Sequence, residues 1–137
     1  MTYKTHEFAQ MMGVSTYTIR YYDKEGMLPF VIRDANGYRV FTDADVNIFK
    51  TILCLKQTGM PLKHIKHYIH LVEVGPETVD ERLEMLEDHK QMVLEKQRLV
   101  TENLKGVQEK IDKYRDPDAK DVIRQELAYV KAEKQNV

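Results

Sequence analysis

Residues 5–26 are THEFAQMMGVSTYTIRYYDKEG, and this segment predicts two short helices joined by a tight turn. Apolar residues recur at helical spacing before Gly13, a residue type that commonly ends a helix. Ser15 is a favoured N-cap, so the second helix is expected to run from Thr16 to Lys24. The arrangement is typical of a helix-turn-helix, although a generic helical hairpin would have the same pattern.

The outward side of the second helix carries hydroxyl and guanidinium groups around its N-terminal turns. Such groups donate hydrogen bonds to phosphates and base edges, and a helix N-terminus itself favours anions. The candidate nucleic-acid contacts on this helix are Ser15, Thr16, Tyr17, Thr18, Arg20 and Tyr21. Tyr22 is either a further contact or a member of the core, and the sequence favours neither alternative.

Residues 28–41, LPFVIRDANGYRVF, predict a β-hairpin, because β-branched and aromatic runs flank Asn36-Gly37. Arg33 and Arg39 would lie on either side of the hairpin tip. A two-stranded hairpin is marginally stable alone, so we expect it to pack against the helices as a wing. The alternative is a solvated surface hairpin whose arginines only increase solubility.

Two further amphipathic helices are predicted after the hairpin, one from Val46 to Thr58 and one beginning at Met60-Pro61. Lys63 lies in the first turn of the later helix, where it would meet a DNA backbone or be solvated. His67 and His70 have the i,i+3 spacing that metal ligands can use. No third ligand converges with them in the sequence, so no metal site is expected.

Residues 13–29, 36–41 and 59–65 together resemble the DNA-binding domain of the MerR family of bacterial transcriptional regulators. The motif Arg-Tyr-Tyr-Asp-x-x-Gly-x-Leu, combined with Asn-Gly-Tyr-Arg, is far more specific than a bare helix-turn-helix. The resemblance implies a winged helix-turn-helix head. It also implies DNA contacts from the recognition helix, the wing and the later helix, at Thr16, Tyr17, Thr18, Arg20, Tyr21, Tyr22, Arg33, Asn36, Gly37, Tyr38, Arg39 and Lys63.

Charge and composition divide the chain at Gly75-Pro76. Residues 1–75 carry nine Lys/Arg and seven Asp/Glu, a net of +2, whereas residues 76–137 carry twelve and fifteen, a net of −3. The chain as a whole is therefore not a uniformly basic nucleic-acid binder, and only its first part has a basic excess. We expect a DNA-binding head over residues 1–75, a long helix over 76–116 and a short C-terminal helix over 117–137.

The long helix is predicted because residues 77–115 contain no proline and only one glycine. Roughly 40 helical residues span about 60 Å, and a lone helix of that length needs a partner. Heptad spacing defines one row of residues, here called the seam, at Val79, Leu83, Leu86, Lys90, Val93, Gln97, Val100, Leu104, Val107, Ile111 and Tyr114. Nine of these eleven are apolar, which predicts a coiled coil, although packing along another protein would use the same face. The resemblance implies antiparallel pairing in a homodimer.

The expected fold is mainly α, with a winged helix-turn-helix head, a long dimerisation helix in an antiparallel coiled coil and a short C-terminal helix. A two-fold dimer presents two recognition helices to a two-fold-related site on double-stranded DNA. The resemblance implies that the dimer bends and untwists a promoter and so realigns it for RNA polymerase. The alternative is a coiled-coil adaptor whose head binds protein. Neither an enzyme nor a cofactor is expected, because no phosphate-binding loop, acid pair or Cys-His-Asp motif is present.

Cys54 is the only cysteine, which excludes an intrachain disulfide and a CxxC metal site. Helical spacing puts it on the polar face of its helix, one turn after Lys50, whose charge would favour a thiolate. We therefore expect Cys54 to be a redox- or electrophile-reactive switch, as in stress- and aldehyde-responsive MerR proteins with one cysteine. The alternative is an incidental thiol covered by the partner's long helix. No drug-binding domain is expected after Arg115, because the segment that follows is short.

A cytoplasmic, nucleoid-associated protein is expected. No apolar stretch approaches the ~18 residues of a membrane span. The first residues also lack the apolar run of a signal peptide.

Overall fold

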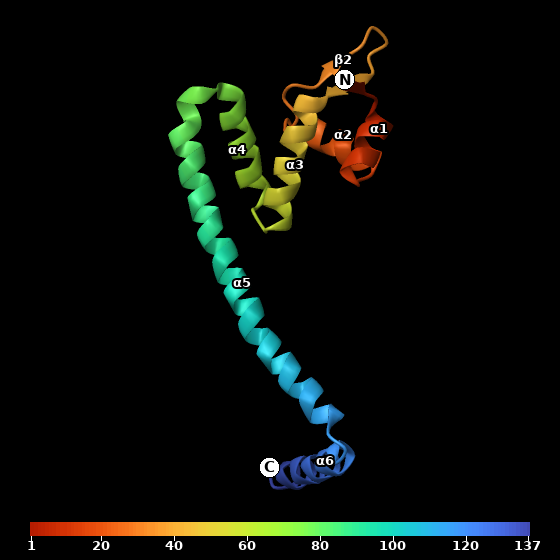
Figure 1. Cartoon of the computed structure of the whole chain (residues 1–137), viewed down its shortest axis with the longest axis vertical. Helices are drawn as coiled ribbons and strands as arrows, with labels where there is room; N and C mark the ends of the chain where they lie inside the picture. Colours follow the sequence, from red (N-terminus) through yellow and green to blue (C-terminus); the bar gives the residue numbers. More distant parts are fainter. The chain divides into compact units, whose positions relative to one another are not determined.

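Helix α1 (Thr5–Met12) packs against helix α2 (Thr16–Lys24) in the computed structural model, which describes every residue from 1 to 137. Gly13 follows α1 with a φ of 69°, a left-handed conformation that glycine adopts without steric cost. The backbone N–H of Val14 donates to the Ala9 carbonyl over 3.0 Å and closes the turn. The predicted helix-turn-helix is confirmed, and Figure 1 shows the two helices next to each other.

A three-stranded antiparallel sheet with the order β1-β3-β2 accompanies these helices. Its strands are β1 (Thr2–Tyr3), β2 (Ile32–Arg33) and β3 (Arg39–Thr42), so β2 and β3 form the predicted hairpin. The sequence did not predict β1, which is too short to show an alternating pattern. Its pairing with β3 ties the N-terminus of the chain to the base of the wing.

The hairpin loop is longer than the Asn36-Gly37 turn on which the prediction was based. Arg33 pairs with Arg39, which leaves residues 34–38 in the loop. The Asp34 carboxylate explains the difference, because it accepts the backbone N–H groups of Asn36 at 2.9 Å and Tyr38 at 3.0 Å. A side chain that satisfies two backbone donors stabilises this wider loop.

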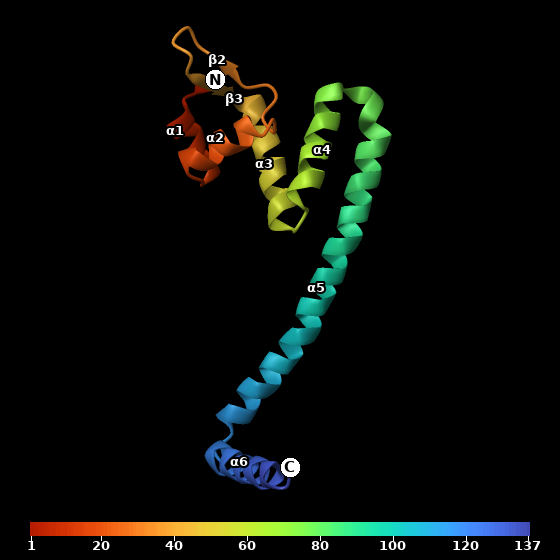
Figure 2. The same cartoon turned by 180° about the vertical axis from the view of Figure 1, so that it is seen from behind.

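Helices α3 (Asp43–Gln57) and α4 (Leu62–Val74) complete the head, and the short 3-10 helix η1 (Pro76–Thr78) follows them. The carboxylate of Asp45 accepts the Thr42 backbone N–H over 2.8 Å and so caps the start of α3. Figure 2 shows α3 and α4 running side by side.

Aromatic rings from four elements form the centre of the head's core. Phe8 of α1 stacks on Phe41 of β3 with 4.3 Å between ring centroids, and Phe49 of α3 meets Phe8 edge-on at 5.7 Å. Tyr22 of α2 meets Phe49 at 5.4 Å. Such aromatic pairs contribute about 0.5–1.5 kcal/mol each beyond the burial of their area. The core therefore holds α2 and the base of the wing in fixed positions.

Helix α5 (Val79–Arg115) is a single helix of 37 residues, which confirms the predicted long helix. Its first turns belong to a compact unit, Met1–Val93, that extends beyond the boundary expected at Gly75. The extension has a packing cause. Leu86, although a seam residue, packs against the head's core, and His89 Nε2 forms a 2.7 Å hydrogen bond with the Thr58 hydroxyl.

The second compact unit, Leu94–Val137, contains the rest of α5 and the predicted short C-terminal helix, α6 (Ala119–Gln135). Asp118 is the N-cap of α6, and Lys113 pairs with Glu126 over 2.5 Å between the two helices. No residue of this unit is buried. The unit therefore has no core of its own.

The seam is largely exposed along α5. Val100 is 67% exposed and Leu104 is 60% exposed, and the other exposed apolar seam residues are Val79, Leu83, Val107, Ile111 and Tyr114. The mainly α class, with its wing, long helix and short C-terminal helix, is confirmed. None of the helices combines the length and the apolar character that crossing a membrane requires.

Candidate nucleic-acid interface

The exposed face of α2 is a row of polar side chains at helical spacing. Tyr17 is 75% exposed, and Arg20, Tyr21 and Lys24 are also exposed on successive turns. Thr16 and Thr18 are half-buried at the start of the helix. The row presents a guanidinium, an ammonium and phenol hydroxyls on one surface, and these are the donors that phosphates and base edges accept.

Ser15 acts as the N-cap of α2, as the sequence predicted. Its side-chain oxygen accepts the backbone N–H of Thr18 over 3.1 Å, and the two hydroxyls lie 2.9 Å apart. The cap fixes the point at which α2 begins. Because the helix dipole concentrates positive potential at this end, the start of α2 favours an anion.

Tyr22 is in the core, which decides the alternative that the sequence left open. It is 2% exposed, and its ring meets Phe49 of α3. Its neighbour Tyr21 is 39% exposed, because adjacent helical positions differ by about 100° in direction. The expected nucleic-acid contact at Tyr22 is therefore wrong as far as its buried ring is concerned. The ring instead helps to hold α2 against the head.

A groove of about 670 Å³ brings the start of α2 together with the wing. Thr16 and Arg20 of α2 line it, and the wing contributes Asp34, Asn36, Tyr38, Arg39 and Val40. The N-terminal residues 2–7 form the rest of its lining. Five of the residues predicted as nucleic-acid contacts thus meet in one place, although they come from two separate segments of the sequence.

The one acidic residue of α2 and the acidic C-cap that follows it are both paired with cations from other elements. Asp23 pairs with Arg39 of β3, and Glu25 pairs with Lys66 of α4. No ion pair engages Arg20 or Lys24. The exposed row of α2 therefore has two cations without an ion-pair partner, although the helix and its C-cap contain two basic and two acidic residues.

The two wing arginines differ in what they contact. Arg33 is exposed, and its Nη1 donates to the Gly37 carbonyl over 2.7 Å across the hairpin loop. Arg39 is about one-fifth exposed, and its Nε donates to the Asp23 carboxylate over 2.5 Å. Arg39 therefore anchors the wing to α2, a role that its position beside the hairpin tip did not indicate.

The other wing candidates, Asn36, Gly37 and Tyr38, are exposed at the loop, and Tyr38 is the largest of them. Lys63 is exposed in the first turn of α4, as expected, but it does not line the groove. Cys54 is a free, exposed thiol on α3. No three His, Cys, Asp or Glu side chains are grouped so that they could bind a metal ion.

The N-terminal segment is the part of the groove that sequence reasoning missed. Lys4 and His6 line it, and the backbone N–H of Lys4 donates to the Glu7 carboxylate over 3.0 Å. The Tyr3 hydroxyl donates to Asp43 over 2.6 Å, and this hydrogen bond to a carboxylate raises the pKa of the phenol. Tyr3 therefore remains a neutral hydrogen-bonding group at physiological pH. Only the pairing of β1 with β3 places this segment at the groove.

Comparison with known proteins gives a consistent result. Residues 3–71 match the family described as MerR HTH family regulatory protein. An uncharacterised HTH-type transcriptional regulator of Haemophilus influenzae is 48% identical over 88 residues, which are 64% of this chain and 65% of that relative. The matched part thus covers slightly less than two thirds of the relative's length.

Two crystal structures of similar proteins cover more of the chain. HiNmlR, a MerR family regulator lacking the sensor domain and crystallised with promoter DNA, is 39% identical with a TM-score of 0.81. The match covers 87% of this chain and 94% of that one. A MerR family transcriptional regulator from Bacillus thuringiensis is 38% identical with a TM-score of 0.77, over 83% of this chain and all of that one. With its winged helix-turn-helix, its long helix and these similarities, the chain belongs to the MerR family of helix-turn-helix transcriptional regulators.

Proposed function

We propose that two copies of the chain bind a two-fold-related promoter site, with α2 of each copy in the major groove and each wing on the flanking backbone. The observation that carries this proposal is the exposed, unpaired positive row of α2, which opens onto the groove shared with the wing. The major groove of B-DNA is about 12 Å wide and admits one α-helix. The similarity to HiNmlR, which was crystallised with promoter DNA, supports promoter DNA as the ligand here.

The basic residues have separate roles in this mode. Arg20 and Tyr17 would meet base edges or phosphates in the groove, because they are exposed near the N-terminal end of α2. Arg33 and the loop around Gly37 would lie on the neighbouring backbone. Lys63 would meet a phosphate outside the groove, at the start of α4, and would add affinity without sequence preference.

The dimer would form through residues 77–115, in an antiparallel coiled coil of two α5 helices. Val100 and Leu104 support this, because they are apolar seam residues and are 67% and 60% exposed within the single chain. Lys90 and Gln97 interrupt the seam, and polar seam residues fix the register of a coil at some cost in stability.

The dimer would regulate transcription by deforming its site. A promoter whose spacer is too long for RNA polymerase would be bent and untwisted, so that its recognition elements face the polymerase correctly. Smooth bending of a site by 40–90° costs about 1–6 kcal/mol, an amount that protein contacts can supply. A signal that changes the relative position of the two heads would switch the promoter. The protein would act in the cytoplasm, at the nucleoid, and not as an enzyme.

Cys54 would receive that signal. Its thiol is exposed on α3, four residues before Thr58. The Thr58 hydroxyl donates to the Cys54 carbonyl over 2.7 Å and also bonds His89 of α5. With an aldehyde, the sulfur adds to the carbonyl carbon and the thiol proton ends on the oxygen, which gives a hemithioacetal without any other reactant. An adduct at Cys54 would thus form at the end of α3 that is tied to α5.

DNA binding is tested by titrating the chain with a duplex from the region upstream of its own gene, at several salt concentrations. Phosphate contacts predict a log–log slope of about −0.9 per neutralised phosphate. A flat dependence, or no binding to any upstream fragment, would favour an adaptor whose head binds protein.

The sensor is tested with a Cys54→Ser variant in cells that carry a promoter reporter. The response of the reporter to aldehydes and oxidants should disappear, while its basal level and the DNA affinity stay unchanged. A Thr51→Ala variant, altered one turn earlier on α3, serves as the control. An undiminished response in Cys54→Ser would remove Cys54 from the mechanism and leave DNA binding unaffected.

A further inference from the structure

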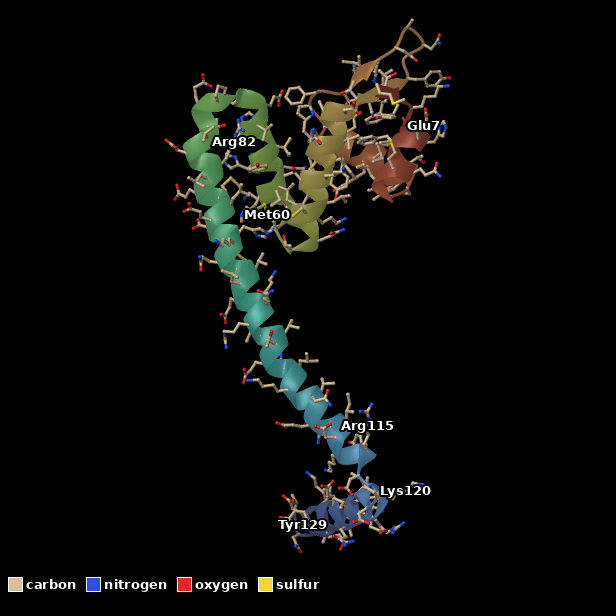
Figure 3. All side chains as sticks on the ribbon, viewed as in Figure 1. Glu7, Met60, Arg82, Arg115, Lys120 and Tyr129 are labelled. Atoms are coloured by element: carbon tan, nitrogen blue, oxygen red, sulfur yellow. The ribbon has the colours of Figure 1, made fainter.

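Arg82 is a half-buried arginine near the start of α5 that donates three hydrogen bonds. Its Nε donates to the Thr78 hydroxyl over 2.8 Å. Its Nη2 donates to the Gly75 carbonyl over 2.7 Å and to the Leu71 carbonyl over 3.2 Å. Figure 3 shows Arg82 where α5 lies beside α4.

The two carbonyl groups lie at the C-terminal end of α4, where each also accepts one backbone N–H, from Gly75 at 3.2 Å for Leu71 and from Thr78 at 3.1 Å for Gly75. The helix dipole gives this end a partial negative charge, so a guanidinium is a favoured partner. Thr78 contributes to the same network, because its hydroxyl lies 2.7 Å from each of the two carbonyl oxygens. Arg82 and Thr78 thus join the end of α4 to the start of α5.

The connection that they close is short and turns at a glycine. Gly75 has a φ of 121°, which residues with a side chain rarely adopt, and it is followed directly by the single turn of η1. Two other bonds also link α5 to the head, Thr58–His89 and the exposed His67–Glu81 pair at 3.0 Å. Each of those involves one pair of atoms, whereas Arg82 makes three contacts at the connection itself.

We propose that Arg82 is a positioning residue that fixes the direction in which α5 leaves the head. In a dimer joined through α5, this direction determines the separation and rotation of the two α2 helices, and therefore the half-site spacing that the protein selects. The inference rests on the proposed function, since spacing has a meaning only for a dimer that binds two half-sites.

The planar guanidinium matters because it reaches Thr78 and both carbonyls at once. A lysine at this position carries the same charge on a single ammonium group and would keep part of the hydrogen-bond network. A methionine has a similar length and no donor. The series Arg, Lys, Met therefore removes the contacts stepwise while largely keeping the volume of the side chain.

The experiment uses a palindromic duplex selected by the wild-type chain from a random-sequence pool. The spacer of this duplex is then changed by one and two base pairs. One base pair adds about 3.4 Å and about a tenth of a turn between the half-sites. Affinities are measured for the wild type, Arg82→Lys, Arg82→Met and Thr78→Val, and each is expressed relative to the same variant's best spacing. Arg98→Met is the control, since Arg98 lies on α5 and pairs only with the exposed Glu95.

When the spacer is changed by one base pair, we expect the DNA affinity of the wild type and of Arg98→Met to fall about tenfold, equal to about 1.4 kcal/mol. The affinity of Arg82→Met should fall only about twofold for the same change, and that of Arg82→Lys by an amount between those of Arg82→Met and the wild type. Thr78→Val should also show a weaker dependence of affinity on spacing. A general loss of stability lowers all affinities of a variant together and leaves this ratio unchanged. If Arg82→Met does not fold, Thr78→Val and Arg82→Lys still test the proposal.

Two outcomes separate the claims. A sharp wild-type profile that stays sharp in the folded Arg82 and Thr78 variants would overturn the role of Arg82 and leave the proposed function standing. A wild-type chain that selects no sequence and binds no duplex would overturn the proposed function and the inference with it.

Discussion

The two compact units of this chain use their apolar side chains in opposite ways. All fifteen buried hydrophobic residues lie between Phe8 and Leu71, within the Met1–Val93 unit. The Leu94–Val137 unit has apolar side chains at regular spacing, and none of them is buried. The first unit is folded by contacts within the chain. The second has the pattern of a surface that is completed by another molecule.

The largest effect should come from breaking the core of the first unit. Phe49 is fully buried and contacts two other rings, so Phe49→Ala should lower the free energy of unfolding by about 3–5 kcal/mol. Phe30 is 48% exposed, so Phe30→Ala should change it by less than about 1 kcal/mol. Chemical denaturation measures both variants. Equal losses in the two would contradict the core described above.

Substitutions on the seam of the second unit should weaken dimerisation. Val100→Lys combined with Leu104→Lys adds two charges to the exposed seam, and should raise the dimer dissociation constant by about 100-fold or more. Glu109→Lys, which adds a charge on α5 outside the seam, is the control. Sedimentation equilibrium measures the constants. If the double variant associates as tightly as the control, the seam is not the dimer interface.

The exposed row of α2 is tested by Arg20→Ala. Removing one guanidinium that no acidic side chain neutralises should lower DNA affinity by about tenfold and reduce the salt slope by about one. Arg124→Ala on α6 removes the same charge in the other unit, where it should have little effect. An unchanged slope for Arg20→Ala would place the DNA elsewhere on the head.

A smaller and sharper test concerns the anchor between the wing and α2. Asp23→Asn removes a negative charge near the proposed DNA surface, which by charge alone would strengthen binding. Because Asp23 holds Arg39, we expect the wing to loosen and binding to weaken by about fivefold, equal to about 1 kcal/mol. Asp80→Asn on α5 is the control for charge. Tighter DNA binding by Asp23→Asn would show that the anchor does not matter.

Features that depend on neighbouring residues could be predicted from the sequence. Ser15 as a cap, the end of α1 at Gly13 and the continuous α5 all follow from local chemistry and helical spacing. The exposed positions of Tyr17 and Arg20 also follow, because a helix with one apolar face must present the opposite face. The predicted contacts on α2 and the wing are therefore mostly exposed; Tyr22 is buried, and Thr16, Thr18 and Arg39 are half-buried.

Features that depend on the tertiary fold could not be predicted. Tyr21 and Tyr22 are equally suited to surface or core, and only the position of Phe49 decides between them. Asp23 and Arg39 are sixteen residues apart, and no spacing rule pairs a helix with a strand. The position of Leu86 could not be predicted either. The heptad pattern assigns it to the seam, whereas in the fold it packs against the head's core.

The central claim is that two copies, joined through α5, bind one duplex. Native mass spectrometry of the chain with and without a selected palindromic duplex tests it most directly. The account predicts a protein mass of twice 16.2 kDa, or 32.4 kDa, without DNA and a complex of two chains per duplex. A single chain of 16.2 kDa at micromolar concentration, or one chain per duplex, would contradict it.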